Sequence, residues 1–254
     1  MPTVHFDSPS IRRKIATARE YGDRIKSISL DYNTQVDRIF KRYIQSLRIA
    51  LTSGDNTDII VNNLIGDLRA ILNELIGRSM EIACQREGVD SELYTALLSA
   101  EVPECNIEHY DEALEKYKEI LTLELLMARE LGFDSELELF LVNPQGIMSS
   151  RRGGLLELQQ GVSAVDKGVS YSFGVNMKKL GISAAAMVYA TASMQLWKNN
   201  GDVSYYFGVR NSNYPCPLCD EYQYQLIPLS AGMIYPLHNR CVCSTVPVNQ
   251  SEIL

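Results

Sequence analysis

The sequence predicts an α+β protein with a mainly α-helical N-terminal domain and a small C-terminal α+β unit. Apolar residues recur at helical spacing over about the first half of the chain, glycines then become frequent, and short β-branched and aromatic runs follow. The length of 254 residues suits one large or two modest domains. We therefore expect an all-α domain over 1–142, a glycine-rich connection over 143–181 and a small α+β Cys/His unit over 182–254.

The first predicted helix runs from Ser8 to Leu51, because apolar residues follow one another there mostly in steps of three, four and seven. Ser8-Pro9 supplies an N-terminal cap, and the polar stretch 52–56 ends the helix. A helix of this length packs along another helix or another subunit. The alternative is a break near Tyr21-Gly22-Asp23 that gives two shorter helices.

Three further helices are predicted in the first 132 residues. The first has apolar residues at helical spacing and runs from Thr57 or Asp58 to Gly88. Asp90 begins a shorter helix that ends near Pro103, and a last helix covers 106–132. The N-terminal part therefore consists of four helices.

The connection and the C-terminal unit differ from the helical part in residue composition and in the pattern of apolar residues. Seven glycines fall between Asn143 and Gly181, a density that argues against a continuous helix. A short alanine-rich helix is expected from Ile182 to about Lys198. Strand-like segments then follow at 203–209, 225–229 and 242–248.

The composition and charge restrict the class of protein. Hydrophobic residues make up 46% and charged residues 22%, and no apolar run is long enough to span a membrane, so we expect a soluble chain. Its N-terminus lacks the basic and apolar segments of a secretion signal, so synthesis in the cytoplasm is expected.

The net charge of −7 is unevenly distributed, at +5 over 1–48, −14 over 49–140 and +2 over 141–254. This pattern favours a role for charge in aligning copies of the chain or its partners, and it argues against general nucleic-acid binding. The simpler alternative is that the charges lie on solvated helix faces. A DNA-binding module would need the arginines and lysines of 12–26 as its basic face. These residues lie on several sides of the helix, which favours solvated charges.

Four of the six cysteines gather near the C-terminus as Cys216-Pro-Leu-Cys219 and, after His238, Cys241-Val-Cys243. Two such pairs from separate segments can complete a tetrahedral site, and a mixed Cys/His set suits a structural zinc ion. Within a strand, Cys241 and Cys243 would face the same side. We favour Cys216, Cys219, His238 and Cys241 as ligands, with Cys243 as the alternate; disulfides or free thiols are the competing interpretation.

The remaining cysteines, Cys84 and Cys105, sit alone in apolar helical segments and are expected to be buried small hydrophobic residues.

No catalytic motif accompanies the cysteines. Pro215-Cys216-Pro-Leu-Cys219 matches half of the zinc-deaminase signature, but neither His5 nor His109 has a glutamate two residues on. An HNH-type nuclease would need a second histidine near the motif. We therefore expect no enzymatic activity, while a zinc-dependent nuclease or deaminase-like enzyme and a zinc-stabilised DNA-binding module stay open as alternatives.

The C-terminal residues resemble a known family. Tyr235-Pro-Leu-His238-Asn-Arg-Cys241-Val-Cys243-Ser-Thr-Val-Pro-Val248, preceded by the C-x-x-C pair, is similar to the signature of the phage Mu F-like minor head proteins, also called the SPP1 gp7-type head morphogenesis family. The resemblance covers roughly 180–248. Where that family often has Asp-x-Arg before the first pair and a glycine after it, this chain has Arg210 and Asp220.

The resemblance implies a structural phage or prophage protein that acts in capsid assembly at or near the portal. It would be made in the bacterial cytoplasm and would belong to the virion head. Its implied partners are portal and capsid proteins, and the long N-terminal helix is a candidate surface for homo-oligomer formation. No membrane partner is implied.

Overall fold

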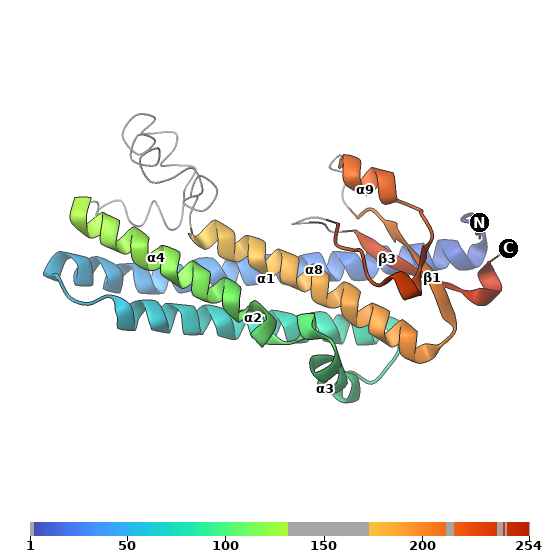
Figure 1. Ribbon diagram of the computed structural model, residues 1–254, viewed down its shortest axis with the longest axis horizontal. Coiled ribbons are helices and arrows are strands. Elements are labelled where there is room, and N and C mark those ends of the chain that lie inside the picture. Colours follow the sequence, from blue (N-terminus) through green and yellow to red (C-terminus); the bar gives the residue numbers. More distant parts are fainter. Residues whose placement is uncertain (1–2, 132–172, 212–215, 238–240, 242, 254) are drawn as a thin grey trace. The chain divides into compact units, whose positions relative to one another are not determined.

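The structure is a computed structural model that describes residues 3–131, 173–211, 216–237, 241 and 243–253. It confirms the predicted α+β class, because helices dominate and a small three-stranded antiparallel sheet lies near the C-terminus (Figure 1). The described helices are α1 (Pro9–Ser53), α2 (Asp58–Glu87), α3 (Ser91–Glu101), α4 (Asp111–Leu131), α8 (Phe173–Asn200) and α9 (Pro217–Tyr222). The strands are β1 (Val203–Val209), β2 (Ile227–Pro228) and β3 (Ser244–Asn249), and short 3-10 turns lie at Pro103–Cys105, Ile107–Tyr110, Leu229–Ala231 and Gln250–Glu252.

The four helices predicted in the first 132 residues are all present with closely similar bounds. Helix α1 is continuous through Gly22, so the alternative of a break there is wrong. The glycine serves close packing instead: a Cβ atom at this position would lie 1.7 Å from Asn211 Nδ2 and 2.2 Å from Ser244 Oγ.

The alanine-rich helix begins earlier than predicted. Helix α8 starts at Phe173 rather than at Ile182 and includes Gly174 and Gly181, which the sequence pattern assigns to the irregular connection. Glycine in a helix interior costs about 1 kcal/mol, and packing of the surrounding turns offsets that cost, as the fully buried Met177 illustrates. The rest of the predicted connection, up to residue 172, lies outside the described residues.

Two of the three strands are shorter than predicted. β1 matches its predicted range, whereas β2 pairs over only two residues and β3 begins at Ser244. Cys241 and Cys243 therefore precede the ladder of hydrogen bonds, where their side chains take part in a cysteine cluster.

The chain forms two compact units, each assembled from separate segments. The first unit contains 1–30, 73–109 and 181–254, and the second contains 31–72 and 110–180. The domain boundaries expected at 142 and 181 stay a prediction.

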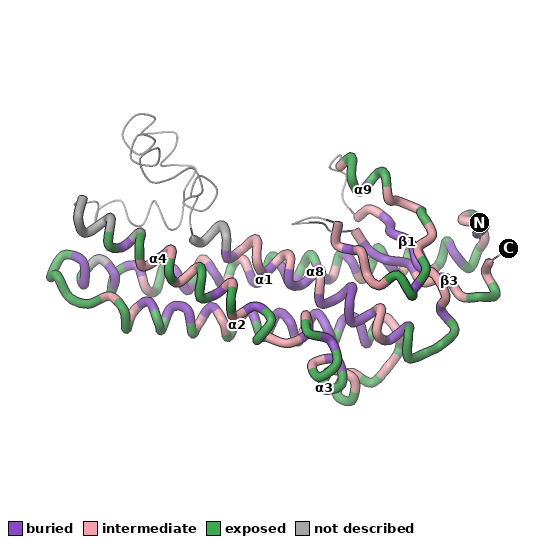
Figure 2. The backbone as a smooth tube through the Cα atoms, in the orientation of Figure 1, coloured by how far each residue is buried: buried purple, intermediate pink, exposed green. Residues whose placement is uncertain are grey.

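In the first unit, the sheet has the order β2-β1-β3, with antiparallel pairs on both sides of β1. One face packs against the first turns of α1, as the buried positions in Figure 2 show for both elements. The residues of this core are Val4, Ile11, Ala18, Phe207, Val209, Val246 and Val248.

The opposite face of the sheet forms a second core with the end of α8. Its buried members are Trp197, Val203, Tyr206, Leu229 and Tyr235. Side chains normally alternate along a strand, yet Val203 and Tyr206 face the same side because the register of β1 against β3 shifts after Val203.

A buried arginine connects three elements of the first unit. The Arg86 side chain of α2 is 3% exposed and donates to the hydroxyl of Tyr189 in α8 at 2.9 Å and to the carbonyl oxygen of Thr245 in β3 at 2.6 Å. Glu87 lies 3.2 Å from its Nε, and the guanidinium sits over the rings of Tyr189 and Trp197. These contacts compensate for burying the charge.

The second unit is helical throughout its described residues and is held by polar contacts around an apolar interior. Arg69 of α2 donates two hydrogen bonds to the carboxylate of Asp111 in α4, at 2.8 and 3.0 Å. Asp67 of α2 accepts from Arg42 and Tyr43 of α1. Fully buried apolar residues occur on every helix of this unit: Val36, Phe40, Leu47, Leu64, Leu68, Leu72, Leu121, Leu125 and Met177.

Within the part of the chain that the structure describes, no helix has both the length and the hydropathy needed to cross a membrane.

Candidate metal centre

The first cysteine pair is presented by the short helix α9. Cys216 occupies its N-cap in an extended conformation, Pro217 begins the helix, and Cys219 lies in the first turn. The amide of Asp220 donates to the carbonyl oxygen of Cys216 at 2.9 Å, which closes this turn. Proline is well suited to the first helical position because no amide hydrogen is needed there.

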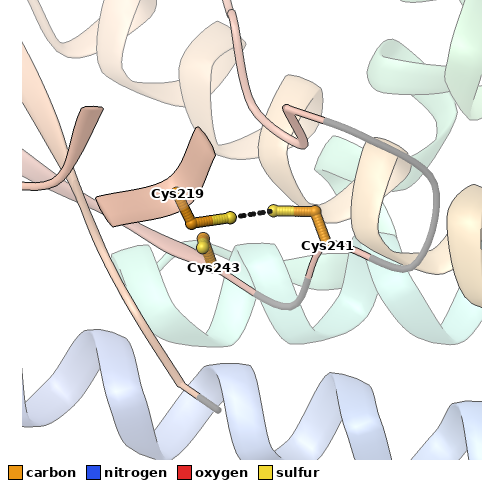
Figure 3. A group of neighbouring side chains, drawn as sticks. All are labelled: Cys219, Cys241 and Cys243. Carbon is orange, nitrogen blue, oxygen red and sulfur yellow. Dashed lines mark hydrogen bonds between the residues drawn. The ribbon is translucent and has the colours of Figure 1, made fainter. Parts of the chain in front are cut away.

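The second pair comes from the segment that leads into β3. The sulfur atoms of Cys219, Cys241 and Cys243 all lie within 4.8 Å of one another. Figure 3 shows the three side chains gathered together. The Cys219 and Cys241 sulfurs are 3.7 Å apart. Zinc–sulfur bonds of about 2.3 Å in a tetrahedron place the sulfurs about 3.8 Å apart, so this spacing fits shared coordination of one ion. Cys219 and Cys241 are buried.

The structure thus brings together three of the five predicted ligand residues. Cys216 is not part of this group, although hydrogen bonding to Cys216 helps to raise the pKa of Cys219. His238 lies outside the described residues. Cys243, which the sequence suggested as an alternate, belongs to the group of three, and all six cysteines of the chain are free thiols.

The electrostatics of the cluster suit a bound cation. Hydrogen bonding from Cys243 lowers the pKa of Cys241 to about 5, although burial opposes this shift. Burial raises the pKa of Cys219 to about 12, and hydrogen bonding to Cys241 together with burial raises that of Cys243. One thiolate is therefore stabilised by its neighbours, whereas further thiolates need a positive charge to compensate them.

Two contacts hold α9 in place beside the sheet. Arg210, which follows β1, forms an ion pair with Asp220, the residue after Cys219. The buried Tyr235 donates its hydroxyl to the carbonyl oxygen of Tyr222 at 3.1 Å. A Cβ atom at Gly208 would lie 2.1 Å from the Tyr235 ring, so only glycine permits this approach.

Sequence reasoning missed these supporting residues. The departures from the family pattern at Arg210 and Asp220 were a usable signal, because opposite charges flanking a metal-binding pair are able to bridge it. Nothing in the sequence indicated that Gly208 and Tyr235, which are far apart in the chain, would meet.

Comparisons of the chain with protein-family models, with curated proteins and with solved structures found no match.

Proposed function

We propose that this protein is a structural minor head protein of a phage or prophage, with a zinc ion stabilising its C-terminal unit. The observation that carries the proposal is the convergence of Cys219, Cys241 and Cys243 from two separate segments. The same residues form the part of the sequence that resembles the head morphogenesis family. The protein would act in capsid assembly at or near the portal and would be located in the virion head after synthesis in the host cytoplasm.

The zinc ion serves as a folding element in this proposal. Three thiols within 4.8 Å of one another need one more ligand to complete a tetrahedron, which Cys216 or His238 supplies. A closed set of four protein ligands leaves no position for a reactive water, so the site supports structure rather than catalysis. The ion joins α9 to the segment before β3 and so crosslinks two separate parts of the first unit.

Elemental analysis of the purified protein tests the metal directly. About one zinc per chain is expected, and Cys219→Ala should lose it because it removes a buried ligand. Cys84→Ala is the matched control, since that thiol lies on α2 outside the cluster. A metal content below about a tenth of an equivalent, with cysteines oxidised on thiol titration, would favour disulfides and exclude the zinc site.

Incorporation into particles tests the biological role. Cys219→Ala is expected to reduce the amount of this protein in purified phage heads, whereas Cys84→Ala leaves it unchanged. Nuclease and deaminase assays on single- and double-stranded substrates should show no turnover. Metal-dependent cleavage that is lost in Cys219→Ala and kept in Cys84→Ala would contradict a structural role.

A further inference from the structure

The first unit carries a surface groove, here called the N-terminal groove, with an apolar floor and a basic rim. It is about 450 Å³ in volume and open to solvent. The residues that line it are Phe6, Asp7, Arg12, Ile15, Arg19 and Tyr224. Arg12, Ile15 and Arg19 follow one another in steps of three and four, so one face of α1 presents a charge, an apolar side chain and a second charge.

The floor of the N-terminal groove is ordered by contacts between aromatic rings. Phe6 packs edge-on against Phe207 of β1 and against Tyr224, with ring centroids 5.1 and 5.4 Å apart. Tyr224 has a φ of 61°, in the left-handed region that bulky residues rarely adopt. Its amide donates to the carbonyl oxygen of Gly208 at 3.1 Å. This unfavourable backbone conformation places an aromatic ring on the groove surface.

The two arginines of the rim are not equivalent. Arg12 is paired with Asp7 at 2.9 Å, whereas Arg19 is exposed and forms no ion pair among the described residues. The groove therefore offers one guanidinium, one helical turn from an apolar floor, to a ligand that carries a carboxylate at matching distance from an apolar side chain.

Helix α4 of the second unit carries such a pattern. Exposed residues at spacings of three and four form a stripe, here called the α4 stripe, of Glu112, Glu115, Glu119, Leu123 and Leu126. Leu123 is 60% exposed and Leu126 is 52% exposed, so both apolar side chains are accessible to a partner. Glu112 and Glu115 pair with Lys116 and Lys118.

Glu119 is the carboxylate of this stripe that forms no salt bridge within the described part of the chain, although Lys116, three positions before it, attracts it electrostatically. Leu123 follows Glu119 by four positions, and Arg19 follows Ile15 by four, so each pair spans about 6 Å along its helix. With the two helices antiparallel, Glu119 meets Arg19 where Leu123 enters the apolar floor.

We propose that the N-terminal groove binds the α4 stripe of a second copy of this chain. Charge complementarity selects this occupant, since residues 1–48 carry a net +5 and residues 49–140 a net −14. The contact joins two different surfaces, so it supports either a reciprocal dimer or continued head-to-tail association. It is independent of the metal site and of the proposed role in phage heads.

Sedimentation of the full-length protein over a range of concentrations tests this contact. The wild-type chain should self-associate, and about 0.5 M salt should weaken the association relative to about 0.05 M. Arg19→Glu and Glu119→Arg should each weaken it by about tenfold or more, because each places like charges opposite one another. Arg13→Glu is the matched control, since that exposed arginine does not line the groove.

Mixing the two charge-reversed variants gives the decisive result. In the mixture, the altered groove of the Arg19→Glu variant meets the altered stripe of the Glu119→Arg variant, and their two unaltered surfaces also match. Association should therefore return, although each variant alone is weak. Circular dichroism of each variant establishes that it is folded. A wild-type protein that stays monomeric at all concentrations, or folded variants whose mixture does not recover, would overturn the proposal.

Discussion

Replacing Gly22 by alanine should destabilise the protein, although alanine is the better helix former. In an open helix interior this change contributes about 1 kcal/mol of stability. Here the new Cβ atom would lie 1.7 Å from Asn211 Nδ2 and 2.2 Å from Ser244 Oγ, so the Asn211 amide has to move away. The hydrogen bond from Asn211 to Ser244, 2.5 Å long, is then lost next to a serine that is 1% exposed.

The magnitude follows from two opposing terms. A lost hydrogen bond whose buried partner stays unsatisfied costs about 1–3 kcal/mol, against a gain in helix propensity of about 1 kcal/mol. The free energy of unfolding should therefore fall by up to about 2 kcal/mol. Urea unfolding followed by circular dichroism measures this difference.

Gly77→Ala provides the matched control for this experiment. Gly77 also lies in a helix interior of the first unit, and nothing stands within 4 Å of a Cβ atom built there. This variant should gain up to about 1 kcal/mol. Equal stability changes in Gly22→Ala and Gly77→Ala would refute the assignment of Gly22 to close packing against the sheet. Partial recovery of Gly22→Ala on adding Asn211→Ala would support it.

Three further outcomes are expected. Hydrogen bonding from Arg69 lowers the pKa of Asp111 below its ordinary value of 3.8, so the stability from this pair is present above about pH 4 and is lost as the pH falls through the lowered pKa. Arg69→Leu should return that pKa to its ordinary range in an NMR titration. Burial raises the pKa of Cys84 to about 11 and that of Cys105 to about 12, so alkylation followed by mass spectrometry at about pH 8 should find both thiols protected until the protein is unfolded. Gly208→Ala should lower both the stability and the zinc content of the protein, because the Tyr235 ring that packs against this glycine orients the segment before the second cysteine pair.

Each of these outcomes has a clear contrary result. An Asp111 pKa that does not change in Arg69→Leu would show that the ion pair is absent in solution. Fast alkylation of Cys84 in the folded protein would show that α2 opens readily. Unchanged zinc content in Gly208→Ala would separate the metal site from the packing of the sheet.

The sequence predicted local structure well where periodicity and caps agreed. The stripe of α1 and the turn residues after it defined a helix that the structure reproduces, and the aromatic run of β1 matched its strand. The start of α8 was missed because Gly174 and Gly181 lower helix propensity, and only tertiary packing offsets that cost. Local sequence patterns do not predict such packing.

In the candidate metal site, too, some features follow from local sequence and others depend on tertiary packing. The spacing of the cysteine pairs predicted a cluster of thiols, and three of the candidates, Cys219, Cys241 and Cys243, meet. Cys216, which was favoured as a ligand, is not in this group, whereas Cys243, which was the alternate, is. The contact of Gly208 with Tyr235 and the pairing of Arg210 with Asp220 depend on how β1, α9 and the later loop pack together. The spacing of residues along the sequence does not predict long-range contacts of this kind.

The packing of the sheet on α1 also constrains how the chain folds during synthesis. Ile11 and Ala18 are covered by Phe207 and Val246, which are made roughly 200 residues later. At about 5–20 residues per second, the ribosome needs about 10–40 seconds to deliver the covering strands. Throughout that interval the apolar side of the first helical turns is open to chaperones and to other nascent chains. The first unit therefore completes its core only after roughly 200 further residues have been made.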